Sequence, residues 1–176
     1  MNILFLIPPP DLARGKTAVD RVYGCNYGYD YKPAVHFLIS ATVLQRYGCM
    51  VRFLDCPAEG ITAKKFIKEL GKDKFDIVVF FTTWLSSGID LQAGGIVFEK
   101  LKNVKVVFMG PYPTWKPELF LINDDYFVVR GEPEETLVDL ISFMESSRGK
   151  LREVRGLSFL ENVKINHNLY RGLLEI

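Results

Sequence analysis

The sequence predicts an α/β fold with a parallel five-stranded sheet and a small C-terminal β-hairpin. Three observations predict it. Short runs rich in Val, Ile and Phe recur along the chain without polar alternation, which is typical of parallel strands covered on both faces. Segments with helical periodicity separate these runs. After Gly149 the helical pattern stops and two short apolar runs follow each other closely.

The five expected strands share a high content of β-branched and aromatic residues. They cover residues 3–7, 51–54, 77–81, 104–109 and 126–129. Strands that alternate with helices form parallel sheets through right-handed crossovers. We therefore predict a flavodoxin-like (Rossmann-like) arrangement with strand order 2-1-3-4-5.

Helix termini are marked by residues that usually start or end helices. Residues 33–47 are largely apolar and are followed by Gly48, a suitable C-cap. Thr62 is an expected N-cap, and residues 87–90 resemble a capping box with Asp in place of Glu. Residues 132–135 place a proline and acids where a helix N-terminus favours them. A helix N-terminus favours negative charge, so Glu132, Glu134 and Glu135 are explained without an acid–base role.

We expect the chain to divide into two parts. Residues 1–150 form the α/β domain, and residues 151–176 form a hairpin and a linker. The hairpin strands are expected at residues 156–160 and 164–165.

Composition excludes several classes of protein. The formal net charge is +1, so no global field attracts nucleic acid or an anionic membrane surface. No apolar run is long enough to span a membrane. Cys25, Cys49 and Cys56 lack C-x-x-C spacing, which argues against a disulfide framework and a zinc site and favours a reducing cytoplasm. We expect a cytoplasmic protein with no metal site made by its own side chains.

Residues 8–32 form a connection much longer than the roughly 2–6 residues usual in such folds. Tyr23, Tyr27, Tyr29 and Tyr31 lie in it. Long loops of this kind serve as lids or docking surfaces, and a surface excursion without function is the alternative.

Ligands of open parallel sheets bind at the carboxyl ends of the strands, where the strand order reverses. The residues of these loops exclude several classes of ligand-binding domain that share this fold. Pro8, Pro9 and Pro10 after the first strand offer no N–H donors for a flavin phosphate, and Thr82 stands where a receiver domain needs aspartate. No glycine-rich dinucleotide or P-loop motif occurs. Hydroxyl groups after the third strand remain as donors, and Ser87 either binds a phosphate or caps its helix.

Four segments in order, ILFLIPPP, HFLISATVLQRYGCMVRFLD, VVFMGPYPT and DDYFVVRGEPEETL, resemble the N-terminal cobalamin-binding domain of class B radical S-adenosylmethionine (SAM) proteins. The resemblance implies that the loops after strands one, three, four and five hold the corrin and its nucleotide tail. The implied cofactor-binding residues are Pro9, Pro10, Thr82, Thr83, Ser86, Gly110, Pro111, Tyr112, Arg130, Gly131 and Glu132.

Two departures from the family pattern qualify the resemblance. The fourth strand usually ends in two glycines, and Met109 replaces the first, where its side chain would narrow the channel for the tail. The D-x-H-x-x-G cobalt-ligand motif is absent, so His36 and His167 are expected to be structural or surface residues. The resemblance implies base-off cobalamin without a protein histidine ligand.

The chain lacks the C-x-x-x-C-x-x-C motif, so a [4Fe–4S] cluster and SAM are expected only in a downstream domain. The chain is then not catalytic alone, and its partner is a radical SAM barrel, in cis or in trans. The alternative is a ligand-free interaction scaffold, which Met109 favours. A third interpretation, an enzyme for another nucleotide, has no catalytic residue set to support it. Arg130, Trp84 and Trp115 are expected at the ligand edge, as contacts of the corrin or of a partner domain, or as packing.

Overall fold

The computed structural model describes residues 1–12, 34–146 and 149–171, and it confirms the predicted α/β fold. The strands described there form one seven-stranded sheet in the order β2-β1-β3-β4-β5-β6-β7. The first five pair in parallel, as predicted, and β6 and β7 are antiparallel. The strands are β1 (Asn2–Ile7), β2 (Met50–Asp55), β3 (Ile77–Phe81), β4 (Lys105–Met109), β5 (Tyr126–Val129), β6 (Leu157–Glu161) and β7 (Lys164–His167).

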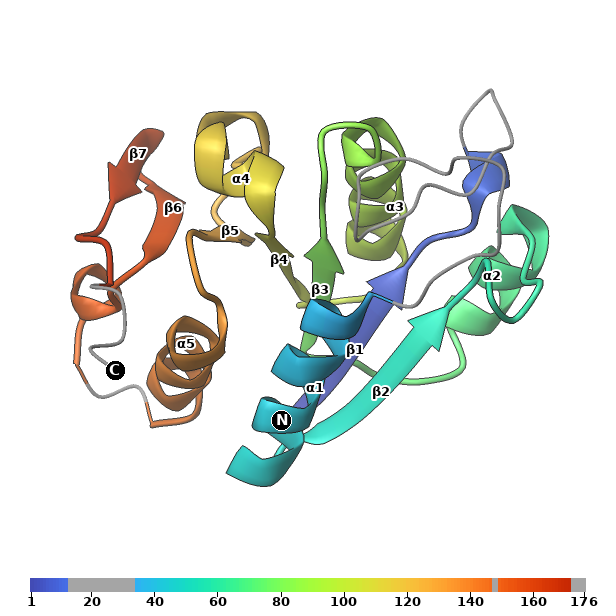
Figure 1. Ribbon diagram of the computed structural model, residues 1–176, viewed down its shortest axis with the longest axis horizontal. Helices are drawn as coiled ribbons and strands as arrows, with labels where there is room; N and C mark the ends of the chain where they lie inside the picture. Colours follow the sequence, from blue (N-terminus) through green and yellow to red (C-terminus); the bar gives the residue numbers. More distant parts are fainter. Residues whose placement is uncertain (13–33, 147–148, 172–176) are drawn as a thin grey trace.

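The C-terminal hairpin extends the main sheet, which the sequence did not indicate. Strand β6 pairs with β5 through Phe127–Phe159 and Val129–Leu157. Both Leu157 and Phe159 are fully buried, so the hairpin completes a core face as well as an edge. Without it, β5 would expose a row of unpaired backbone groups, a costly arrangement for a buried strand. Figure 1 shows the hairpin at the end of the sheet opposite β2.

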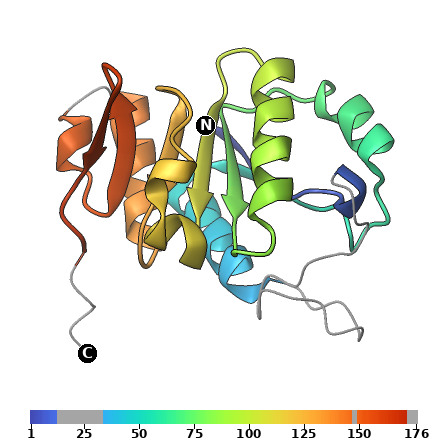
Figure 2. The same ribbon diagram turned by 90° about the horizontal axis from the view of Figure 1, so that it is seen from above.

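Helices cover both faces of the sheet. Helices α1 and α5 pack on one face, whereas α2 and α3 pack on the other, as Figures 1 and 2 show for α1 and α3. No helix in the described ranges combines the length and the apolar character that crossing a bilayer requires. The helices are α1 (Val35–Tyr47), α2 (Ala63–Leu70), α3 (Ser87–Lys100), α4 (Pro111–Trp115) and α5 (Glu134–Ser146), with short 3₁₀ turns at Pro10–Leu12, Pro117–Leu119 and Leu151–Glu153.

Burial on both faces explains why the strands do not alternate with polar residues. Val79 of β3 packs in the cluster under α1 and α5, and its neighbour Phe80 packs in the cluster under α2 and α3. Successive side chains of a strand point to opposite faces. The same alternation determines toward which face of the sheet the last side chain of each strand points at the ligand edge.

Most of the predicted helix ends are confirmed. Gly48 ends α1 in the left-handed conformation (φ 109°), and Thr62 caps α2 by accepting a hydrogen bond from the Lys65 N–H. The predicted capping box at residues 87–90 is wrong, because Ser86 is the N-cap residue of α3 and its side chain makes no capping hydrogen bond. Its hydroxyl is buried and donates to Asp90 at 2.8 Å, while the Ser87 hydroxyl donates to the carbonyl of Trp84.

The Cys56 thiol and the Tyr126 phenol are buried weak acids with raised pKa values, and they predict that the fold loses stability at alkaline pH. Burial, with smaller effects from Asp55 and Glu59, raises the pKa of the Cys56 thiol from 9.0 to about 12. Burial and Glu99 raise the pKa of Tyr126 from 10.0 to about 12. Above pH 9 the unfolded chain ionises first and binds fewer protons, so the free energy of unfolding should fall between about pH 9 and 12.

Equilibrium urea denaturation at several alkaline pH values measures this dependence. Thiol labelling in a Cys25→Ser background provides a second readout, because Cys49 and Cys56 are both buried. We expect labelling at pH 8 to follow unfolding. Rapid stoichiometric labelling of the folded protein, or stability that rises above pH 9, would contradict the prediction.

Candidate functional site

A pocket of about 590 Å³ opens at the carboxyl edge of the sheet, on the face covered by α1 and α5. Its volume lies within the range of small-molecule sites, about 300–1,000 Å³. The wall comes from the start of α1, the end of β3 and the turns after β4 and β5. The lining residues are His36, Ile39, Phe81, Gly110, Pro111, Thr114, Gly131, Glu132, Pro133 and Glu134.

Another hollow, of about 600 Å³, lies at the amino edge of the sheet. Asn2, Cys49, Arg52 and Asp73 line it, and Arg52 and Asp73 form an ion pair there. Ligands of open parallel sheets bind at the carboxyl ends of the strands. The pocket at the carboxyl edge is therefore the candidate site.

The turn after β4 needs a glycine. Gly110 has φ 108° and ψ −175°, a conformation essentially restricted to glycine. A Cβ atom there would lie 2.8 Å from the carbonyl oxygen of Thr82. The chain after β4 therefore passes directly against the chain after β3, and Pro111 follows as the first residue of α4 on the pocket wall.

The turns after β4 and β5 are joined by a hydrogen bond at the pocket. The backbone N–H of Gly131 donates to the Thr114 hydroxyl at 3.0 Å. On the opposite wall, the buried hydroxyl of Ser40 in α1 donates to the Glu134 carboxylate at 2.8 Å. These two contacts link α4 to the turn after β5 and α1 to α5, so both sides of the wall are held in position.

The predicted hydroxyl residues lie behind the pocket. Thr82 follows Phe81, and since Phe81 faces the pocket, Thr82 points to the α3 side of the sheet. Thr83 and Ser86 are buried in a network in which the Thr83 N–H donates to the Ser86 hydroxyl at 2.9 Å. The Thr82 hydroxyl is fully buried and has no hydrogen-bond partner among the described residues.

Three more predicted residues lie away from the pocket lining. The chain turns at Pro9 and Pro10 toward α2, where Asp11 accepts a hydrogen bond from the Ala63 N–H. The ring of Tyr112 packs against Trp115 and against Phe120 of the other core cluster. Their role in cofactor binding remains a prediction.

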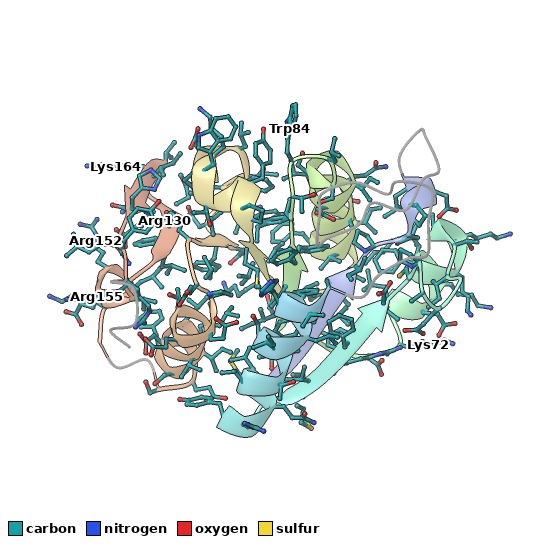
Figure 3. All side chains as sticks on the ribbon, in the orientation of Figure 1. Lys72, Trp84, Arg130, Arg152, Arg155 and Lys164 are labelled. Atoms are coloured by element: carbon teal, nitrogen blue, oxygen red, sulfur yellow. The ribbon has the colours of Figure 1, made fainter. Side chains whose placement is uncertain are left out.

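Arg130 contacts the C-terminal segment and not Glu132. Its guanidinium donates to the backbone carbonyls of Leu157 and Asn168 and stacks on Tyr170, 4.2 Å from the ring centroid. The side chain is buried, and Figure 3 shows it beside β6. Arg130 therefore attaches the hairpin and the residues after it to the carboxyl end of β5.

The two tryptophans project from the rim of the molecule. Trp84 is 71% exposed and Trp115 is 69% exposed, and neither lines the pocket. Figure 3 shows Trp84 projecting outward above α3. Exposed aromatic side chains of this size are enriched at protein interfaces.

Gly110, Pro111, Gly131 and Glu132 are the predicted residues that the structure brings together in the pocket. The other wall residues are His36, Ile39, Phe81, Thr114, Pro133 and Glu134. Thr114, Pro133 and Glu134 lie in the loops after the fourth and fifth strands, which were expected at the ligand edge. His36, Ile39 and Phe81 were not expected there, and the one signal for them was the position of His36 near the start of a predicted helix.

The fold and the pocket define a Rossmann-like α/β domain with a ligand-sized site at the carboxyl edge of its sheet. No protein-family model matches the chain. An uncharacterized methyltransferase of Pyrococcus horikoshii is 29% identical over 177 residues, which cover 99% of this chain and 36% of the relative.

Two similar solved structures are of radical SAM enzymes with cobalamin bound. OxsB, solved with aqua-cobalamin and SAM bound, aligns with a TM-score of 0.70 at 19% identity, over 98% of this chain and 22% of its own. The radical SAM methyltransferase TsrM from Kitasatospora setae, solved with cobalamin and a [4Fe–4S] cluster, aligns with a TM-score of 0.72 at 15% identity, over 99% of this chain and 30% of its own. The chain thus spans about a third or less of these proteins, and at these identities the solved structures establish the fold alone.

Proposed function

We propose that this chain binds cobalamin at the carboxyl edge of its sheet and presents it to a radical SAM catalytic domain. The pocket carries the proposal, because four residues that the family resemblance implies for cofactor binding meet in it. Those residues are Gly110, Pro111, Gly131 and Glu132.

The described residues fit a bulky, mostly neutral ligand. Gly110 allows the backbone of two turns to close against each other without side chains between them. The buried Thr82 hydroxyl has no partner in the described parts of the chain, which costs about 1–3 kcal/mol, and a polar group of the nucleotide tail on that side would recover this cost. His36, Glu132 and Glu134 supply polar groups at the pocket itself.

The motifs that the chain contains and lacks indicate which tasks belong to it and which belong to a partner domain. Bound cobalamin supplies a cobalt centre for group transfer or radical chemistry, whereas the protein supplies binding and orientation. A [4Fe–4S] cluster and SAM belong, in this proposal, to the partner barrel. The relatives support that arrangement, since the matched fold makes up only 22–36% of their length. The exposed Trp84 and Trp115 lie on the rim that such a partner would meet.

Titration with hydroxocobalamin, followed by gel filtration, tests the proposal. We expect the corrin colour to elute with the protein and flavin mononucleotide, the matched control ligand, to elute separately. A spectrum typical of base-off cobalamin would support the finer prediction about its coordination. Absence of any spectral change at about 1 mM ligand, where even a complex of about −4 kcal/mol is half formed, would contradict the proposal and favour the ligand-free scaffold.

A further inference from the structure

The four residues after β7 (168–171), which we call the strap, turn back toward the carboxyl end of β5. The side-chain amide of Asn168 donates to the carbonyls of Leu151 and Val154 at 2.8 and 2.7 Å. Its backbone N–H donates to the carbonyl of Leu157 at 2.9 Å. The beginning of the strap is therefore fixed to the start of β6, and its last two residues reach the elements that form the pocket.

Arg130 joins the strap to one side of the pocket. It directly precedes the pocket residues Gly131 and Glu132. Its buried guanidinium donates to the Asn168 carbonyl and stacks on the ring of Tyr170. A shift of the strap therefore changes the surroundings of the residue that begins the turn after β5.

Arg171 joins the strap to the first turn of α5. Its Nε donates to the Thr136 hydroxyl at 3.0 Å, and its guanidinium pairs with the Glu135 carboxylate at 2.8 Å and with the Asp139 carboxylate. Glu135 and Asp139 lie four residues apart and so share one face of the helix. Glu134, one residue earlier, lines the pocket. The first turn of α5 therefore serves the pocket on one side and the strap on the other.

The contact between these parts is too close to allow one of them to move alone. A Cβ atom at Gly156 would lie 2.6 Å from the Thr136 hydroxyl and 3.2 Å from the Arg130 carbonyl oxygen. The Thr136 hydroxyl also donates to the carbonyl of Arg155 at 2.9 Å. Closely packed groups transmit displacements because no free space absorbs them. The strap, the turn after β5 and the start of α5 thus form one connected unit.

We propose that the strap couples the pocket to the part of the chain that follows Arg171, so that ligand binding and attachment of the strap stabilise each other. This inference rests on the proposed function. A ligand in contact with Glu132 and Glu134 orders the same two turns that hold the strap. Order that one event has produced is not required again by the other, and such coupling is reciprocal. A radical SAM barrel that follows in the same chain is then held more firmly beside a loaded pocket than beside an empty one.

Amide hydrogen exchange of the cobalamin-free chain tests the first half of the coupling. Arg171→Ala should raise exchange rates by about threefold or more in residues 131–138, where the Leu137 N–H donates to the Pro133 carbonyl at 2.8 Å. The amides of β3 should keep their rates. Arg152→Ala is the matched control, because Arg152 pairs with Glu161 on the exposed side of the hairpin and should leave residues 131–138 unchanged.

Hydroxocobalamin titration of the same variants tests the second half. We expect Arg171→Ala to weaken binding by about threefold to tenfold and Arg171→Lys, which keeps the charge, to weaken it less. Arg152→Ala should bind as the unaltered chain does. Bound cobalamin should in turn slow exchange of the Asn168 N–H, which reports attachment of the strap.

Three results would overturn the coupling and leave the proposed function standing. The first is unchanged exchange at residues 131–138 in Arg171→Ala. The second is a uniform rise that includes β3, since that indicates a general loss of stability. The third is equal cobalamin affinity of Arg171→Ala and Arg152→Ala. Failure of the unaltered chain to retain cobalamin would overturn both the coupling and the proposed function.

Discussion

Shortening Met109 to alanine is expected to lower the free energy of unfolding by about 2–5 kcal/mol. The side chain is fully buried at the end of β4, in the same cluster as Val107, Val129 and Leu137. Its loss removes apolar area from the core and leaves a cavity among β-strands that cannot move freely. Urea denaturation followed by circular dichroism measures the change.

Met50→Ala is the matched control, because Met50 is 70% exposed on the edge strand β2. Its effect should stay within about 0.5 kcal/mol. Equal effects of the two substitutions would show that Met109 is not the core residue that the structure describes.

The same variant separates packing from ligand binding at position 109. Met109 does not line the pocket, although it lies one residue before Gly110. We therefore expect Met109→Ala to retain cobalamin about as well as the unaltered chain at temperatures where it remains folded. A gain in affinity of about tenfold or more would mean that the methionine obstructs the nucleotide tail and would restore the interpretation drawn from the sequence.

Replacing Gly110 with alanine is expected to damage both the fold and the site. The backbone conformation alone should cost about 1–3 kcal/mol for a residue with a Cβ atom. The new atom would also lie 2.8 Å from the Thr82 carbonyl oxygen, so one of the two turns must move. Since Gly110 and Pro111 line the pocket, we expect cobalamin affinity to fall by about tenfold or more, which corresponds to about 1.4 kcal/mol.

Gly131→Ala distinguishes the steric effect from the backbone effect. Gly131 also has positive φ, 76°, but a Cβ atom there would meet nothing within 4 Å. We expect its stability loss to be the smaller of the two. If Gly110→Ala matched Gly131→Ala in denaturation and in cobalamin titration, the close contact of the turns after β3 and β4 would have no energetic consequence.

Local sequence determined the parallel part of the fold. Runs such as residues 77–81 have no polar alternation because both faces of β3 are buried, and a run of that kind is visible without any tertiary information. Gly48 and Thr62 act within one helical turn, so their neighbours along the chain suffice to predict their roles. Gly110, Pro111, Gly131 and Glu132 were also predictable, since turns after parallel strands meet at one edge of the sheet.

The tertiary structure alone decided the role of Arg130 and the composition of the pocket wall. Arg130 contacts carbonyls about 27 and 38 residues further along the chain, and no local pattern encodes contacts at that separation. Phe81 and Thr82 are adjacent in sequence, yet the strand geometry sends one to the pocket and the other to the α3 side. His36 joined the site because α1 packs beside α5 and brings its first turn to the carboxyl edge. Propensity and spacing act over a few residues, whereas the ligand site depends on how distant elements pack.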